Sequence, residues 1–182
     1  MTKSLMTAFL VFSAVPAFSG ENLLKNGDFE EEGTAGPMDW LFDEKLAPKG
    51  TVEVVKAKST LNKKGKLALQ LSPTAKNTDQ DHLLGIFQYF SARHYKGKTL
   101  QLSGRLLAKG EATNALAMFV INKDGSFSQK GAVLVRTAKE GDWGEVKGEL
   151  AIEGGMDTLV VVCLAGGISG QALFDDVSVS VK

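Results

Sequence analysis

The sequence predicts an all-β protein, a two-sheet antiparallel β-sandwich arranged as a jelly roll. Short runs in which apolar and polar residues alternate with a period of two are separated by Gly, Asn, Asp and Lys at intervals of roughly ten to fifteen residues. Helical periodicity is almost absent after residue 20. The chain has 182 residues, which is enough for one domain to bury a core of its own.

The expected strands differ in how their faces are used. In the run 143–153, Val146, Leu150 and Ile152 share one face and charged residues share the other, which predicts a strand with a solvated outer surface. The run 158–165 is apolar on both faces, as a central strand is. The full set of expected strands is part of 22–30, then 51–57, 66–72, 82–90, 98–109, 114–123, 132–138, 143–153, 158–165 and 171–181.

Residues 1–19 have the pattern of a signal peptide. Lys3 precedes an apolar run from Leu5 to about Phe18, and small residues follow where a signal peptidase cleaves. The run is too short for a membrane span, which needs about 20 apolar residues. We therefore expect a single domain over 20–182 that is secreted or periplasmic, with no membrane span.

The composition offers little for catalysis. Lys plus Arg and Asp plus Glu both total 21, and no basic cluster indicates nucleic-acid binding. The two histidines, His82 and His94, lack the spacing of a metal site or a catalytic triad, and Cys163, flanked by apolar residues, is expected to be a buried, inert thiol. The sequence predicts that the protein is not an enzyme. A hydrolase acting through carboxylates such as Asp79, Asp81 or Glu111 is an alternative.

Two adjacent carboxylates, Asp175 and Asp176, lie within the last expected strand, where Asp is unusual. Calcium binds carboxylate and carbonyl oxygens gathered from distant segments. If the first and last strands are neighbours, Glu30 and one of the C-terminal acids are able to hold one ion. The alternative is ordinary solvated charge at strand ends.

Several segments together resemble a known family. "NLLKNGDFEEEG" at the start and "FDDVSV" at the end, with "GKLALQLS", "GIFQYF", "YKGKTLQLSGRLLAKG" and "GDWGEVKGEL" in order between them, are similar to CenC-type carbohydrate-binding modules, which have a galactose-binding-domain-like jelly roll. The resemblance runs from about Asn22 to Val181. It implies a non-catalytic domain that binds polysaccharide and carries a structural calcium ion remote from the sugar. It assigns the metal to Glu30 and Asp175 and gives Asp176 no role.

A polysaccharide site needs aromatic faces for stacking and polar groups for sugar hydroxyls. The available platforms are Trp40, Phe42 and Tyr89, and Trp40 is also a candidate for the core. The available polar partners are Gln88, which matches a recurrent Gln of the family, with Gln101 and Arg105 from the outer face of the run 98–109. Trp143 is expected to be structural.

The sequence also departs from the sugar-binding pattern. It has only two Trp and two Tyr, and the run 114–123 places Ala117, Phe119 and Ile121 where polar or aromatic groups would serve a glycan. These features predict a more apolar groove than that of a cellulose or xylan binder. The alternative function is an envelope or extracellular protein-interaction domain, with a protein partner, that has the same fold without sugar binding.

Overall fold

A computed structural model describes residues 21–34, 36–42, 50–56, 67–73, 84–136, 141–167 and 169–182. The expected signal peptide, residues 1–19, lies outside the described residues. Within these ranges, no helix has the length and apolar character needed to cross a membrane.

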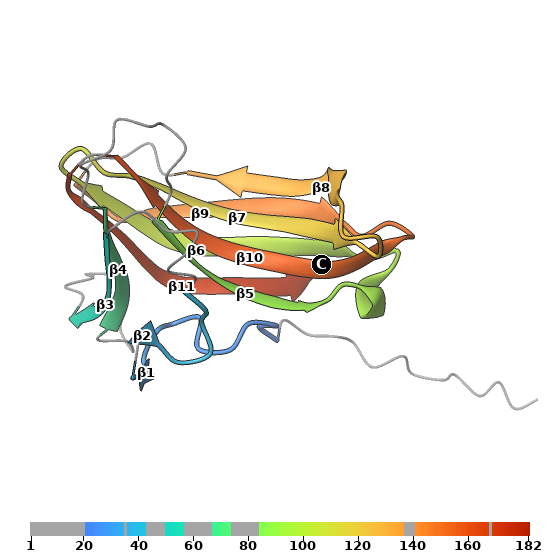
Figure 1. The fold of residues 1–182 in the computed structure, drawn as a ribbon, viewed down its shortest axis with the longest axis horizontal. Coiled ribbons are helices and arrows are strands. Elements are labelled where there is room, and N and C mark those ends of the chain that lie inside the picture. The colour runs from blue at the N-terminus through green and yellow to red at the C-terminus, as the bar shows by residue number, and fades with distance from the viewer. Residues whose placement is uncertain are drawn as a thin grey trace, which may run out of the picture.

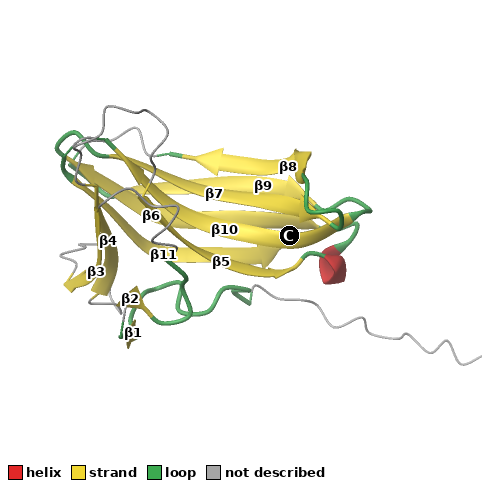
Figure 2. Ribbon diagram, in the orientation of Figure 1, coloured by secondary structure: helices red, strands yellow, loops and turns green. Residues whose placement is uncertain are grey.

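Two antiparallel sheets pack face to face, which confirms the predicted sandwich (Figures 1 and 2). The four-stranded sheet has the order β5 (Leu84–Ser91), β10 (Met156–Gly166), β7 (Thr113–Asn122) and β8 (Phe127–Val135). The five-stranded sheet has the order β3 (Gly50–Lys56), β4 (Leu67–Pro73), β11 (Gln171–Val181), β6 (Thr99–Lys109) and β9 (Gly144–Ala151). The small elements are β1 (Glu32–Gly33), β2 (Gly36–Pro37) and the 3-10 turn η1 (Arg93–Tyr95).

The core lies between the sheets and follows the predicted alternation. Leu100, Leu102 and Leu106 of β6 are fully buried, and Leu159, Val161 and Cys163 of β10 face them from the other sheet as part of the same core cluster. As predicted, β10 is a central strand that is apolar on both faces, paired with β5 on one side and β7 on the other. Its second face is the outer surface of the four-stranded sheet.

The first expected strand is absent, because residues 21–31 form turns and bends that lie against β11 instead. The amide of Leu23 donates to the carbonyl of Val179 (2.8 Å), and the amide of Val177 donates to Gly27 (2.8 Å). Asn22 adds two contacts, since its Nδ2 donates to Val177 O (3.0 Å) and its Oδ1 accepts from Val179 N (3.0 Å). The two ends of the described chain are therefore neighbours, as a calcium site shared by Glu30 and a C-terminal acid requires.

We expect Gly27→Ala to destabilise the fold. A Cβ at this position meets the backbone carbonyl oxygen of Val177, which cannot move without breaking the contact with β11. The loss should be about 1–3 kcal/mol, as for other overpacked sites. Urea denaturation measures it, and Gly154→Ala is the comparison, because the added carbon there meets only the flexible end of the Lys96 side chain (3.5 Å) and Gly154 has no positive φ.

The hairpin between β7 and β8 turns at Asp124 and Gly125, as the Asp-Gly pair predicts. A two-residue hairpin turn of the Asp-Gly type needs a positive φ at both central residues. Here only Gly125 has one (+83°), so the turn has a different form. Asp124 Oδ1 accepts hydrogen bonds from the amide (2.9 Å) and hydroxyl (2.6 Å) of Ser126, and these bonds lower the pKa of Asp124. This side-chain cap stabilises a longer turn.

Candidate functional site

The six residues predicted for carbohydrate binding do not lie together. Trp40 and Phe42 pack on the core, and Gln88 and Tyr89 lie on opposite faces of β5. Gln101 and Arg105 lie on the outer face of the other sheet. Of the six, only Tyr89 presents a widely exposed aromatic ring.

Trp40 belongs to the core and not to a surface platform. Its ring is 8% exposed and packs on the fully buried Phe29, with 5.3 Å between ring centroids. Its Nε1 donates to the carbonyl of Asn26 (3.0 Å). Phe42 is half-buried and packs on the core beside it. Burial of Trp40 removes the indole face that a sugar ring would need.

Gln88 holds the N-terminal segment in place. Its side chain lies on the inner face of β5 and is 9% exposed. The amide Nε2 donates to Lys25 O (2.6 Å), and Oε1 accepts from Lys25 N (3.2 Å). Both polar atoms of the Gln88 side chain are thus bonded to the backbone of Lys25. The role of Gln88 is structural, and its amide is not available to a ligand.

Gln88→Ala should therefore lower stability, in contrast to the sugar-binding role expected from the sequence. The Lys25 amide and carbonyl would lose two part-buried hydrogen bonds, at a cost of about 0.5–1.5 kcal/mol for each bond. Thermal melting measures the effect, with Gln101→Ala as a half-buried glutamine control on the other sheet. A melting temperature unchanged by Gln88→Ala would contradict the anchoring role.

Arg105 is enclosed on the outer face of the five-stranded sheet. It is 7% exposed, and its guanidinium carbon lies 5.2 Å from the centroid of the Trp143 ring. It forms an ion pair with Asp176, with 3.6 Å between Arg105 Nη1 and Asp176 Oδ2, and it lies opposite Asp175 and Glu145 in the strand register. Trp143 is half-buried and packs its ring against this guanidinium group. Gln101 lies further along the same face, opposite Ser180 and Glu149.

The paired acids occupy a β-bulge in β11. The register with β6 shifts between Asp175 and Ser178, and Asp176 has a φ of +50°. Asp175 is fully buried, and its Oδ1 accepts the amide hydrogen of Asp176 (2.8 Å). Asp176 is exposed beside Arg105. The bulge explains how a strand accommodates two adjacent Asp residues.

Glu30 lies near the strand that carries these acids. Its Oε1 accepts from the amide of Leu67 (3.0 Å), at the start of β4. β4 pairs with β11, with Leu69 opposite Phe174, the residue before Asp175. Within the described ranges, no group of three or more His, Cys, Asp or Glu residues is able to hold a metal ion by side chains alone. A calcium ion here would need backbone carbonyl oxygens as well.

An open hollow of about 330 Å³ lies between the N-terminal turns and the bulge. It is lined by Asn22, Leu24, Asn26, Gly27, Asp28, Asp176, Val177 and Ser178. Most of its lining residues are polar, and the amides of Asn22 and Asn26 are already bonded to the backbone. The hollow is therefore lined largely by residues that attach the N-terminal segment to β11, and we do not assign it a ligand.

The outer face of the four-stranded sheet is apolar and carries aromatic rings. The strand register places Tyr89, Val160, Phe119 and Ala132 in one row, and Phe87, Val162, Ala117 and Leu134 in the next. Leu41 extends the second row, because it forms a β-bridge with Phe87, and Ile121 and Phe127 pair at the end near the β7–β8 turn. We call this set of ten residues and Leu41 the aromatic face.

Exposure on the aromatic face is greatest at its margins. Tyr89 is 60% exposed on one side, and Phe127 is 69% and Leu134 52% exposed on the other. Val160 and Val162 of the central strand are 7% and 9% exposed. Phe87 stacks with Tyr89 and Phe119 contacts Phe127, with centroid distances of 6.4 Å and 5.4 Å. Two aromatic pairs thus flank a valine and alanine centre.

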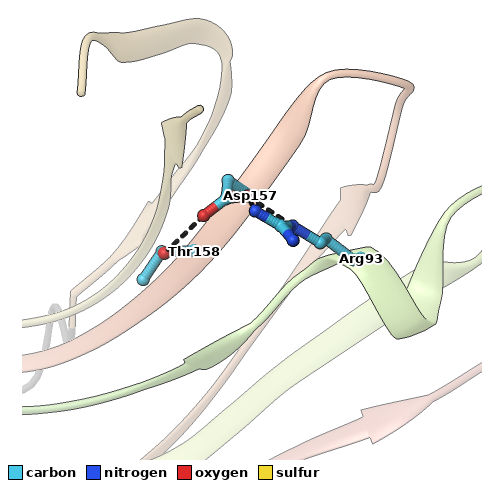
Figure 3. Close-up of polar contacts among 3 residues, drawn as sticks. All are labelled: Arg93, Asp157 and Thr158. Atoms are coloured by element: carbon cyan, nitrogen blue, oxygen red, sulfur yellow. Dashed lines mark hydrogen bonds and ion pairs between the residues drawn. The ribbon is translucent and has the colours of Figure 1, made fainter. Parts of the chain in front are cut away.

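Polar side chains gather at one end of the aromatic face (Figure 3). Thr158 lies opposite Ser91 and Ile121 in the strand register, and its hydroxyl donates to Asp157 Oδ2 (3.2 Å). Arg93 of η1 forms a hydrogen bond from Nε (2.5 Å) and an ion pair to the same carboxylate. The Arg93 side chain is 63% exposed, so part of its guanidinium group is open to a ligand.

The candidates for catalysis are dispersed. Asp79 and Asp81 lie outside the described residues, and Glu111 is exposed and accepts a hydrogen bond from Ser169 (3.1 Å). Cys163 is fully buried, and desolvation raises the pKa of its thiol well above the ordinary value. The burial of Cys163 predicted from the sequence is confirmed.

A thiol reagent such as an aromatic disulfide should therefore leave Cys163 unmodified in the folded protein at pH 8, because the protected thiol is neither exposed nor ionised. The same reagent should modify one thiol per chain in denaturant. Rapid modification under native conditions would contradict the packing of β10.

Comparison with known proteins rests on structure alone, since no family model matches the sequence and no curated protein matches it. The enzymatically active domain of bacteriophage CBA120 tailspike protein 4 is similar, with a TM-score of 0.69 and 12% identity over 88% of this chain and 21% of that chain. This chain thus spans about a fifth of the tailspike structure.

Two carbohydrate-binding modules match over nearly their whole length. TmCBM61, solved in complex with beta-1,4-galactotriose, has a TM-score of 0.56 and 20% identity over 90% of this chain and 100% of that chain. The CBM22-1 xylan-binding domain of Paenibacillus barcinonensis Xyn10C has a TM-score of 0.56 and 19% identity over 91% and 97%. The chain has the jelly-roll fold that carbohydrate-binding modules adopt.

Proposed function

We propose that the protein is a secreted, non-catalytic carbohydrate-binding module that uses the aromatic face to bind polysaccharide. The observation that carries this proposal is the pair of aromatic clusters at the margins of one sheet face, with Tyr89 exposed and stacked on Phe87. Aromatic rings supply the flat apolar surface on which pyranose rings stack. At one end, Arg93 supplies hydrogen-bond donors and the Thr158 hydroxyl oxygen supplies an acceptor.

This site replaces most of the residues expected from the sequence. Tyr89 is retained as a platform, and Phe87, Phe119 and Phe127 are added. Gln101 and Arg105 are on the opposite side of the sandwich, so they are not part of this site. The similarity in fold to modules whose structures include a galactotriose complex and a xylan-binding domain supports the general class of ligand.

We also propose that a calcium ion near Glu30 and Asp175 stabilises the fold. The supporting observation is that Asp175, a fully buried carboxylate, lies in a strand next to the one that Glu30 contacts. Carboxylate and carbonyl oxygens are the ligands calcium prefers. Its role would be structural, since the aromatic face lies on the other sheet.

The test is a binding screen of the mature protein against soluble and insoluble polysaccharides, with calcium and then with a chelator, while melting is followed in parallel. Binding supports the module, and a lower melting temperature in chelator supports the ion. Absence of binding to every glycan overturns the carbohydrate proposal. An unchanged melting temperature in chelator overturns the calcium proposal independently.

A protein-interaction domain is the second candidate, and the apolar character of the aromatic face favours it. Contiguous exposed apolar surface is typical of protein interfaces. This candidate predicts no glycan binding and a partner that covers Tyr89, Phe127 and Leu134. A crosslink between a photoreactive residue at position 134 and a protein from the same organism, lost in Tyr89→Ala, would support it.

A further inference from the structure

The aromatic face has few groups that are able to hydrogen-bond with a sugar. Among its described side chains, only the Tyr89 hydroxyl is polar, and Ser91, Thr158 and Arg93 lie at one end of the face. The backbone amides and carbonyls of the central strand, β10, are hydrogen-bonded to β5 and β7. A ligand lying across the centre meets only the small exposed parts of Val160 (7%), Val162 (9%) and Ala117 (6%), all of which are apolar.

An unmodified polysaccharide is poorly matched to this centre. Each sugar hydroxyl pressed against Val162 or Ala117 gives up its bonds to water and receives none in return, which opposes binding. An acetyl group has a methyl that gains from leaving water, and its carbonyl oxygen needs only one donor. Replacing hydroxyls with acetyl groups therefore removes an unfavourable contact and adds a favourable one.

We propose that the ligand of the aromatic face is an acetylated polysaccharide, with its acetyl methyl groups packed on Val160, Val162 and Ala117 and its sugar rings stacked on Tyr89 and Phe127. This inference rests on the proposed function and names the ligand class for that same site. The acetyl group belongs to an O-acetyl ester or to an N-acetyl amino sugar, and both present the same methyl group and carbonyl.

The experiment compares matched pairs of polysaccharides that differ only in acetylation. Acetylated xylan, glucomannan and galactan are each tested beside the same batch after mild alkaline deacetylation, and chitin is tested beside chitosan. Affinity electrophoresis measures the soluble pairs, and depletion assays measure the insoluble pair. We expect at least one acetylated form to bind tenfold or more tightly than its deacetylated partner. The ester pairs and the chitin pair separate the two sources of acetyl.

Variants connect the preference to the face. Val162→Thr keeps the side-chain shape but adds a hydroxyl at the centre, so the preference for the acetylated form should fall at least threefold. Ala117→Ser is a second variant of the same kind, in case Val162→Thr fails to fold. Val55→Thr is the matched control, because Val55 is a half-buried valine on the outer face of the other sheet.

The outcomes are distinct. Equal binding of both members of every pair leaves the carbohydrate function standing and overturns the acetyl inference. A preference that neither Val162→Thr nor Ala117→Ser reduces also overturns it, because recognition then lies elsewhere. Binding to no member of any pair overturns the proposed function together with the inference.

Discussion

Tyr89→Ala is expected to weaken glycan binding at least tenfold while leaving the fold intact. The ring is 60% exposed and is the most accessible aromatic platform on β5. Removing an aromatic anchor from a binding site commonly costs more than 1 kcal/mol, and about 1.4 kcal/mol corresponds to tenfold in affinity. Truncating an exposed side chain changes stability little. Affinity electrophoresis and thermal melting measure the two effects.

Phe127→Ala should act in the same direction, because Phe127 stands at the opposite margin and is 69% exposed. Gln101→Ala is the control, since Gln101 lies on the outer face of the other sheet and should leave affinity unchanged. The reverse pattern, in which Gln101→Ala weakens binding and Tyr89→Ala does not, would move the site to the five-stranded sheet. Gln101 and Arg105 would then be the polar partners of the glycan, as the sequence predicted.

The sequence was sufficient to predict the strands and the two-sheet class because burial of one strand face imposes a period of two. Leu100, Leu102 and Leu106 are buried where alternation placed them, and Val146, Leu150 and Ile152 follow the same rule. Every expected strand from residue 51 onward is present. Most differ by one or two residues at their ends, but β8, expected at 132–138, begins five residues earlier, at Phe127. These features depend on local pattern.

The candidate site depended on pairing between distant strands, which alternation does not specify. The pattern correctly placed Gln101 and Arg105 away from the core, but it did not say that β6 and β5 belong to different sheets. The aromatic face forms only because β5, β10, β7 and β8 lie side by side. One sequence feature could have indicated this face. Phe87 is two residues before Tyr89, so the two rings lie on the same, outer side of β5.

The N-terminal segment was the least predictable part because side chains, not a repeating pattern, determine its course. Asn26 has a φ of +45°, and its amide contacts Glu31 and Met38 through hydrogen bonds of 2.7–3.0 Å. Phe29 has a φ of +55° and is fully buried. Asn22 and Asn26 were missed as structural residues, and both occur in the opening motif "NLLKNGDFE".

Trp40→Ala should be the most destabilising of the substitutions considered. It removes a large ring from a site bounded by Phe29 and also removes the donor to Asn26 O, so the turn loses both packing and a hydrogen bond. Replacing a buried Trp by Ala typically costs about 3–5 kcal/mol. Denaturant unfolding, followed by circular dichroism, measures the free energy of unfolding.

Two controls separate the contributions of packing and hydrogen bonding. Trp40→Phe keeps an aromatic ring and loses the donor, so it should cost clearly less than Trp40→Ala. Leu41→Ala changes the next residue, which is 45% exposed, and should cost little. If Trp40→Ala instead retained full stability and abolished glycan binding, Trp40 would be the stacking platform that the sequence allowed. The N-terminal turns would then have to open in solution to expose the indole face.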